Sequence, residues 1–169
     1  MQDGIIYVTE DRKGEGFFET MLIGENLFRG LLASGHDRAM VIRMSDIADI
    51  AADWTRKLNI KSINAGARVV ELSGGYQQKV VIGRGLIQKS SVVIFDEPTR
   101  GVDVAAIAEF HQMNNALADD GLAVVMISSY LPEIMDLFDR ILDCRQGRIV
   151  EDLSPVDASE GKIMYAAVD

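Results

Sequence analysis

A short glycine turn is the first stretch of the sequence whose residue types suit phosphate chemistry. Ser73, Gly74 and Gly75 form this small and flexible turn, and the run that follows, Gln77–Gln88, predicts a helix. The first backbone N–H groups of a helix have no partner within it, and the helix dipole places partial positive charge at the same end. The turn therefore predicts a binding site for an anion such as phosphate.

Two adjacent carboxylates make the second such stretch. Val92–Phe95 is wholly apolar and shows no polar alternation, which is typical of a strand buried on both faces of a parallel sheet. Asp96 and Glu97 follow directly, at the carboxyl end of the strand, where open α/β sheets bind their ligands. A metal-binding aspartate followed by a glutamate base is the pairing that phosphoryl transfer to water requires.

These stretches resemble the motifs of ABC-type ATPases. LSGGYQQKV, beginning at Leu72, resembles the signature motif, and VVIFDEPTRGVD, from Val92 to Asp103, resembles the Walker B strand and D-loop. The segments DEPTRGVDV, ISSYLPEI and YVTEDRKGEG resemble one branch in particular. That branch is the second ATPase half of the tandem ATP-binding subunits of bacterial sugar importers, of the ribose, galactose, arabinose and xylose type. The resemblance runs from about Gly4 to the C-terminal tail.

The resemblance implies ATP and Mg²⁺ as cofactors and a role for each motif residue. Glu97 aligns with the catalytic base, and Asp96 with a residue at the Mg²⁺ ion. The residues implied to contact nucleotide are Ser73, Gly74, Gly75, Gln77, Glu10, Asp103 and Ser129. Glu10 stands at the Q-loop position, where a glutamine normally reaches the Mg²⁺ and the attacking water. A carboxylate there can still bind Mg²⁺, so Glu10 is also a candidate metal ligand.

Two of these residues have a plain structural alternative, and Ser129, like Glu10, departs from the common family pattern. The run from Glu10 to Lys13 is also typical of a solvated loop, and Asp103 is also typical of a helix N-cap. Ser129 stands where most ABC ATPases carry a histidine that contacts the γ-phosphate. A hydroxyl cannot supply the cationic donor that imidazole can.

An ABC ATPase also needs a P-loop, Gly-x-x-x-x-Gly-Lys-Ser/Thr, and this sequence contains none. Gly161-Lys162 is followed by Ile163, and valine stands at position 156, where the first glycine would be required. We therefore expect a C-terminal piece of a tandem ATPase that begins just before the Q-loop. Such a piece would donate its signature motif to ATP held by the partner half and would be inactive alone. Its strands would expose edges and apolar surface.

The implied partners are a first ATPase half or a second ATPase copy, the transmembrane permease subunits and, indirectly, a sugar-binding protein. The implied location is cytoplasmic, peripheral on the inner face of the cell membrane. A non-transport ABC ATPase acting on translation or DNA, and a non-catalytic truncated remnant, are the alternatives. The formal net charge of −9 argues against a nucleic-acid partner, because phosphate binding relies on clustered Lys and Arg.

The chain has 169 residues, enough for about one domain with a core. Its apolar runs fall far short of the ~20 residues that a membrane span needs, and its first residues resemble no signal peptide. The single cysteine, Cys144, excludes an intrachain disulfide. We expect Cys144 to be buried in a strand, Arg140–Cys144, as a small apolar side chain.

The expected class is α/β: a partial P-loop NTPase (ABC ATPase) fold with a mostly parallel sheet, a helical subdomain and no Walker A portion. The helical subdomain, with Q-loop and signature, would cover about residues 11–85, and residues 86–169 would form the Walker B half of the core and the tail. The expected strands are Gly4–Val8, Val92–Phe95 and Ala123–Ser128. Helices are expected over Met21–Leu32 with a break at Ser34–Asp37, from Ser45 to Leu58, and over Val104–Leu117, Pro132–Phe138 and Ser159–Met164. Gln146-Gly147 indicates a hairpin turn.

Overall fold

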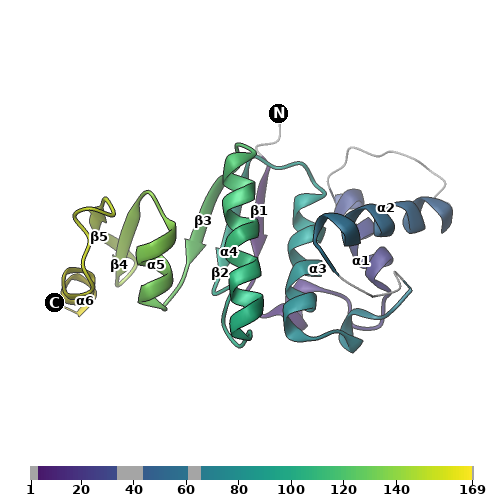
Figure 1. Ribbon diagram of the computed structural model, residues 1–169, viewed down its shortest axis with the longest axis horizontal. Helices are drawn as coiled ribbons and strands as arrows, with labels where there is room; N and C mark the ends of the chain where they lie inside the picture. The colour runs from purple at the N-terminus through teal and green to yellow at the C-terminus, as the bar shows by residue number, and fades with distance from the viewer. Residues whose placement is uncertain (1–3, 34–43, 61–65, 169) are drawn as a thin grey trace. The chain divides into compact units, whose positions relative to one another are not determined.

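The computed structural model describes residues 4–33, 44–60 and 66–168 (Figure 1). The predicted helix break at residues 34–37 lies outside the described residues. The chain divides into two compact units, Met1–Ile127 and Ser128–Asp169, and each is described by itself. Among the described helices, none is both long and apolar enough to cross a membrane.

A three-stranded parallel sheet forms the centre of the first unit. Its strands are β1 (Ile5–Val8), β2 (Val92–Asp96) and β3 (Ala123–Ile127), in the order β1-β2-β3. Ile5 pairs with Val92, and Val92 pairs in turn with Ala123, so the strands run level and end at the same edge. The three predicted strands and their parallel arrangement are confirmed within one residue at each end.

One face of this sheet is buried under helices. The inward side chains of β1 and β2 are almost fully buried; they are Ile6, Val8, Val93 and Phe95. Helix α3 (Gly74–Leu86) packs on β1, and α4 (Val104–Asp119) sets Phe110 edge-on against Phe95, with ring centroids 5.1 Å apart. Such edge-to-face aromatic pairs stabilise a core beyond the area they bury.

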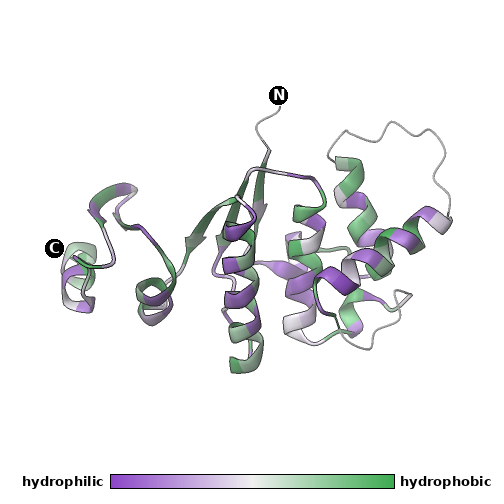
Figure 2. Cartoon of the chain, turned by 45° about the horizontal axis from the view of Figure 1, so that its top comes forward, coloured by the Kyte–Doolittle hydropathy of each residue, from purple (hydrophilic) through white to green (hydrophobic). Residues whose placement is uncertain are grey.

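The opposite face of the sheet is only partly covered in the described structure, which corrects the expectation that Val92–Phe95 is buried on both faces: Val92 and Ile94 are half-buried. Every second residue of β1 and β3 lies on this face: Ile5 is 60% exposed, Tyr7 56%, Val125 46% and Ile127 49%. Figure 2 shows the strands as a nearly continuous hydrophobic band. The expectation that the strands expose apolar surface is therefore confirmed.

Two further helices complete this unit: α1 (Ile23–Ala33) packs against α3, and α2 (Met44–Lys57) packs against α1. α1 buries Ile23 and Leu27 completely in the shared core. Gly30 on α1 lies so close to α3 that a Cβ atom there would stand 2.1 Å from the Arg84 carbonyl oxygen. α1 begins two residues later than predicted, and α2 one residue earlier.

The loop after β1 is more ordered than a solvated loop. It contains a single π-helical turn, Arg12–Gly16, whose first residues are held by Asp11. Asp11 Oδ1 accepts a hydrogen bond of 2.9 Å from the Gly14 N–H. A π-type turn satisfies hydrogen-bonding groups of this segment's backbone locally. No hydrophobic periodicity in the sequence predicts it.

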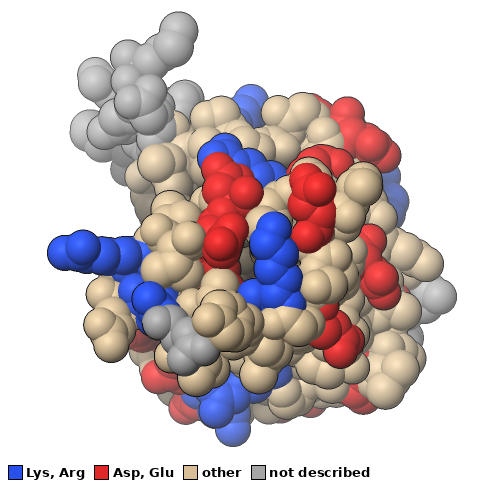
Figure 3. Space-filling model, turned by 90° about the vertical axis from the view of Figure 1, so that its left-hand side faces the viewer, with Lys and Arg blue, Asp and Glu red and all other residues tan. Residues whose placement is uncertain are grey.

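The second unit has α5 (Leu131–Leu137), a hairpin of β4 (Ile141–Arg145) and β5 (Arg148–Leu153), and α6 (Glu160–Val168). Its core joins Ile141, Leu153 and Ile163. The predicted hairpin is confirmed, since Gln146 and Gly147 both adopt positive φ angles, as tight two-residue turns require. On the face shown in Figure 3, acidic and basic side chains lie side by side.

Cys144 is exposed, so its predicted burial is wrong. The side chains of β4 alternate, with Ile141 and Asp143 buried and Leu142 and Cys144 exposed. A strand of period two places Cys144 on the outer face as soon as Ile141 faces the core.

Candidate functional site

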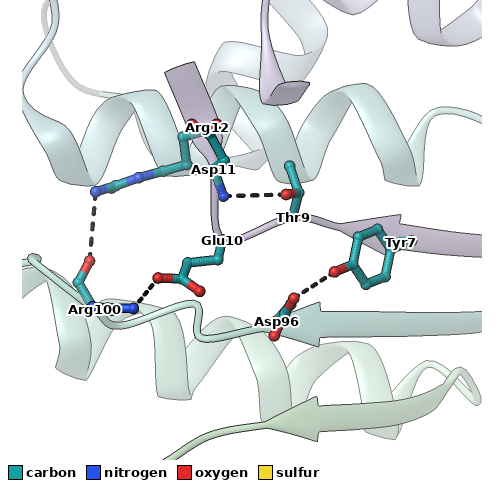
Figure 4. Close-up of polar contacts among 7 residues, drawn as sticks. All are labelled: Tyr7, Thr9, Glu10, Asp11, Arg12, Asp96 and Arg100. Atoms are coloured by element: carbon teal, nitrogen blue, oxygen red, sulfur yellow. Dashed lines mark hydrogen bonds and ion pairs between the residues drawn. The ribbon is translucent and has the colours of Figure 1, made fainter. Parts of the chain in front are cut away.

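The carboxyl ends of β1 and β2 bring the first polar cluster together (Figure 4). Tyr7 on β1 donates its phenolic O–H to Asp96 Oδ2 at the end of β2. This hydrogen bond, with partial burial and the negative charge of Asp96, raises the pKa of the Tyr7 phenol above its ordinary value. Asp96 is half-buried. The predicted metal ligand thus has a phenol as its partner in this structure.

Glu97 begins the loop after β2 in a strained backbone conformation. Its φ angle is +44°, in the left-handed region that favours glycine. Its N–H donates a 2.8 Å hydrogen bond to the Ile127 carbonyl oxygen at the end of β3. Conformations of this kind persist only where the surroundings impose them, and they are frequent at functional sites.

Glu10 lies in the loop after β1 and forms an ion pair with Arg100 in the loop after β2 (Figure 4). Both side chains are substantially exposed, at 42% and 69% of their surface for Glu10 and Arg100 respectively. An exposed pair of this kind adds little stability. The ion pair does orient the Glu10 carboxylate toward Arg100.

Mg²⁺ is implied by the resemblance, and both of its candidate ligands are engaged by other side chains in this structure. Asp96 is engaged by Tyr7, and Glu10 is engaged by Arg100. Within the described ranges, no three His, Cys, Asp or Glu residues converge on one point. A Mg²⁺ ion on a nucleotide is commonly held by only one or two carboxylates, with water and phosphate oxygens completing the octahedron, so Asp96 and Glu10 have the chemistry of its ligands.

The glycine turn of the sequence, Ser73–Gly75, is called the signature turn from here on. Helix α3 begins at Gly74, three residues before the predicted start, so Gly74 and Gly75 belong to its first turn. Ser73 is the N-cap with extended backbone, and its hydroxyl makes no hydrogen bond to the described first turn. Buried Gln77 instead fixes the entry to the helix, since its Nε2 donates to the Leu72 carbonyl oxygen at 3.1 Å.

Gly75 faces the start of helix α4. A Cβ atom at Gly75 would lie 2.8 Å from the Cβ of Ala106, closer than real side chains approach. Asp103 caps α4, because its Oδ1 accepts a 2.9 Å hydrogen bond from the Ala106 N–H. The N-cap interpretation of Asp103 is therefore confirmed. The signature turn and the aspartate of the D-loop motif meet at Ala106.

Ser129 belongs to the second unit and is described within it. It is exposed in the segment that leads into α5. Its neighbour Ser128 shapes this segment: Ser128 Oγ donates to buried Glu133 at 3.1 Å and accepts from the Tyr130 N–H at 3.1 Å.

Two residues that the sequence did not single out contact motif residues in the structure. Arg12 reaches the signature turn, where its Nη1 donates to the Gly74 carbonyl oxygen at 3.0 Å. Tyr7 reaches Asp96 across the sheet. A signal existed for Tyr7, since strand alternation with Tyr7 opposite Ile94 puts it on the face that carries Asp96. For Arg12, inside a charged loop, no local pattern gave a signal.

Comparison with known families gives one match over most of the chain. The sequence profile described as "ABC transporter" matches residues 1–100. Two curated proteins named "Ribose import ATP-binding protein RbsA" are similar. The one from Caldanaerobacter subterraneus subsp. tengcongensis is 38% identical over 99% of this chain. The one from Rhodococcus jostii is 43% identical over 99% of this chain.

A "Xylose import ATP-binding protein XylG" from Moorella thermoacetica is 43% identical, again over 99% of this chain. The chain covers 34%, 33% and 33% of these three proteins, about one third of their length.

Solved structures share the fold. An ATP-binding cassette of an ABC transporter superposes with a TM-score of 0.78 at 19% identity, covering 98% of this chain and 69% of the other. A dimeric cassette in a post-hydrolysis state, bound to ADP and Pi, has a TM-score of 0.73 at 20% identity and covers 90% of this chain and 63% of the other. The predicted fold class is confirmed by these likenesses.

Proposed function

This chain belongs to the ABC transporter family, and from that membership we propose that it is part of the ATP-binding subunit of a bacterial sugar importer. The observation that carries this proposal is the similarity to ribose and xylose import ATP-binding proteins over nearly the whole chain. These names favour sugar import over a non-transport ATPase. The activity proposed for the assembled protein is ATP hydrolysis coupled to import.

Within that activity, the proposed role of this chain is to donate its signature turn to ATP held by a partner ATPase half. Two features support the role. The first turn of α3 carries no side chain at Gly74 or Gly75, and the Ser73 hydroxyl does not cap it. Its N–H groups and the positive end of the helix dipole therefore suit a phosphate. Ser73, Gly74, Gly75 and Gln77 are the residues proposed to form this contact.

From the resemblance we also propose Glu10, Asp103 and Ser129 as residues that contact a second nucleotide, with Glu97 as general base. We propose Asp96 and Glu10 as its Mg²⁺ ligands in a state where they have released Tyr7 and Arg100. The serine at position 129 and the glutamate at position 10 both depart from the common pattern, which favours low turnover at this site. The partners proposed for the assembly are a second ATPase half or copy, permease subunits and a sugar-binding protein, at the inner face of the membrane.

We expect the isolated chain to bind no Mg-ATP at micromolar concentration. The reason is the absence of a P-loop sequence, which supplies the backbone cradle and the lysine for a nucleotide's own phosphates. Isothermal titration calorimetry of the purified chain with Mg-ATP provides the test. Saturable micromolar binding with a stoichiometry near one would contradict the expectation.

We also expect Glu97→Gln to leave most of the steady-state ATP hydrolysis of the assembled ATPase. A general base contributes ~10²–10⁴-fold at a site that turns over, and nothing at a site that does not. The residual activity should therefore stay within about twofold of the parent, whereas loss of an active base would remove nearly all of it. Glu160→Gln, at the exposed start of α6, is the matched control. A loss of 100-fold or more by Glu97→Gln alone would show that this chain's own site is the catalytic one.

A further inference from the structure

The side chain of Arg12 crosses from the loop after β1 to two other motif loops. Its Nη1 donates to the Gly74 carbonyl oxygen at 3.0 Å. Its Nη2 lies 3.5 Å from the Arg100 carbonyl oxygen, a contact drawn in Figure 4. The path passes two glycines: a Cβ on Gly74 would stand 3.7 Å from Nη1, and one on Gly101 would stand 3.9 Å from Nη2. Arg12 therefore joins the signature turn to the loop that follows the two carboxylates.

The base of Arg12 is held in place by its own loop. The Asp11 N–H donates to Thr9 Oγ1 at 3.1 Å, and Asp11 Oδ1 accepts from the Gly14 N–H at 2.9 Å. Glu10, two residues before Arg12, is paired with Arg100. The same two loops are thus connected twice, once through Glu10 and once through Arg12. A side chain rooted in a fixed turn orders what it binds at a low entropic cost.

We propose that Arg12 is a positioning residue that fixes the backbone of the signature turn for contact with phosphate. Glycine has the largest conformational freedom of any residue, and α3 begins with two of them. A hydrogen bond from a guanidinium to the Gly74 carbonyl restricts that freedom from the side opposite to the N–H groups. Ionic hydrogen bonds of this kind are stronger than neutral ones.

The positive charge of Arg12 also supports this role. A cation beside a helix N-terminus is unfavourable for the helix alone, because the helix dipole already places positive charge there. Among the described residues Arg12 makes no ion pair that would neutralise it. A bound phosphate reverses the sign of this interaction. The arrangement is therefore favourable when the signature turn is occupied by an anion.

The inference rests on the proposed function, and its test uses the assembled ATPase that contains this chain. Arg12→Ala should lower kcat for ATP hydrolysis about 10-fold, the effect of losing one ionic hydrogen bond. Vanadate-trapped nucleotide should fall by the same factor, while equilibrium binding of ATP to the partner half stays unchanged. Arg12→Lys, which keeps the charge and one donor toward Gly74, should recover activity to within about threefold of the parent. The control is Lys13→Ala, which removes a neighbouring exposed cation and should change none of these quantities.

Gly75→Asp, measured in parallel, distinguishes a failure of the proposed signature-turn donation from a failure of the proposed role of Arg12. If Gly75→Asp hydrolyses ATP like the parent, the proposed donation of the signature turn fails and this inference fails with it. If Gly75→Asp is inactive while Arg12→Ala traps vanadate like the parent, only the role of Arg12 is refuted. Equal losses in Arg12→Ala and Lys13→Ala would also refute it, because they would reflect total charge. A reduced stoichiometry of ATP binding in Arg12→Ala would indicate misfolding and likewise contradict a positioning role.

Discussion

Replacement of Gly75 by aspartate is expected to reduce steady-state ATP hydrolysis of the assembled ATPase by at least about 100-fold, the effect of losing a preorganised donor to developing negative charge. A side chain at this position would occupy the space that the phosphate needs. Its carboxylate would also repel the phosphate in a site of low effective dielectric constant. Phosphate release or ATPase assays on the reconstituted transporter measure the loss.

Three companion variants separate charge from packing at Gly75. Gly75→Ala adds only a methyl group, which would lie 2.8 Å from the Ala106 Cβ and press α3 against α4. Combining it with Ala106→Gly removes that contact and should restore part of the activity. Gly161→Asp makes the same chemical change on α6, where a Cβ meets nothing within 4 Å, and should leave hydrolysis unchanged. Parent-like hydrolysis by Gly75→Asp would overturn the donation of the signature turn.

The second large effect is expected on stability. Gly30→Ala should lower the free energy of unfolding by about 3 kcal/mol, at the upper end of what overpacking a core costs. The new Cβ would stand 2.1 Å from the Arg84 carbonyl oxygen and 2.8 Å from Ile87 Cγ2. The carbonyl is part of the α3 backbone and cannot rotate away, so α1 and α3 must separate.

Urea unfolding followed by the fluorescence of Trp54, which is half-buried against the core that α1, α2 and α3 share, measures the change. Gly161→Ala is the control, since helix α6 is open there and alanine is the better helix former by about 0.5–1 kcal/mol. Equal midpoints for Gly30→Ala and the parent would show that the two helices do not depend on this close approach.

The elements of the fold were largely predictable from local sequence. The apolar composition of Val92–Phe95 predicts β2, and the turn residues Gln146-Gly147 predict the hairpin. The start of α3 was predicted too late, because glycine disfavours helix in isolation, whereas here Gly74 and Gly75 lie in the first turn of α3. Cys144 was assigned to the wrong face because a short strand gives too few residues to fix its phase.

The candidate site was predictable in its motifs and not in its contacts. The partners Glu10 and Arg100 are 90 positions apart, and Arg12 and Gly74 are 62 positions apart. Neither pair leaves a local pattern, because charged residues in a loop look the same whether they face water or another motif. The roles of Glu97, Asp96 and the signature turn in catalysis stay predictions from the resemblance.

The parallel pairing of β1 with β2 has a consequence for synthesis of the chain. Tyr7 and Asp96 lie 89 positions apart, so β1 leaves the ribosome long before its only described neighbour in the sheet exists. At ~5–20 residues per second this delay is roughly 4–18 s. During that time α1 and α2 can already pack against each other, since their contacts are local and form quickly. β1 thus gains its partner strand only after α1, α2 and α3 have been synthesised, and its apolar residues must stay out of wrong pairings until then.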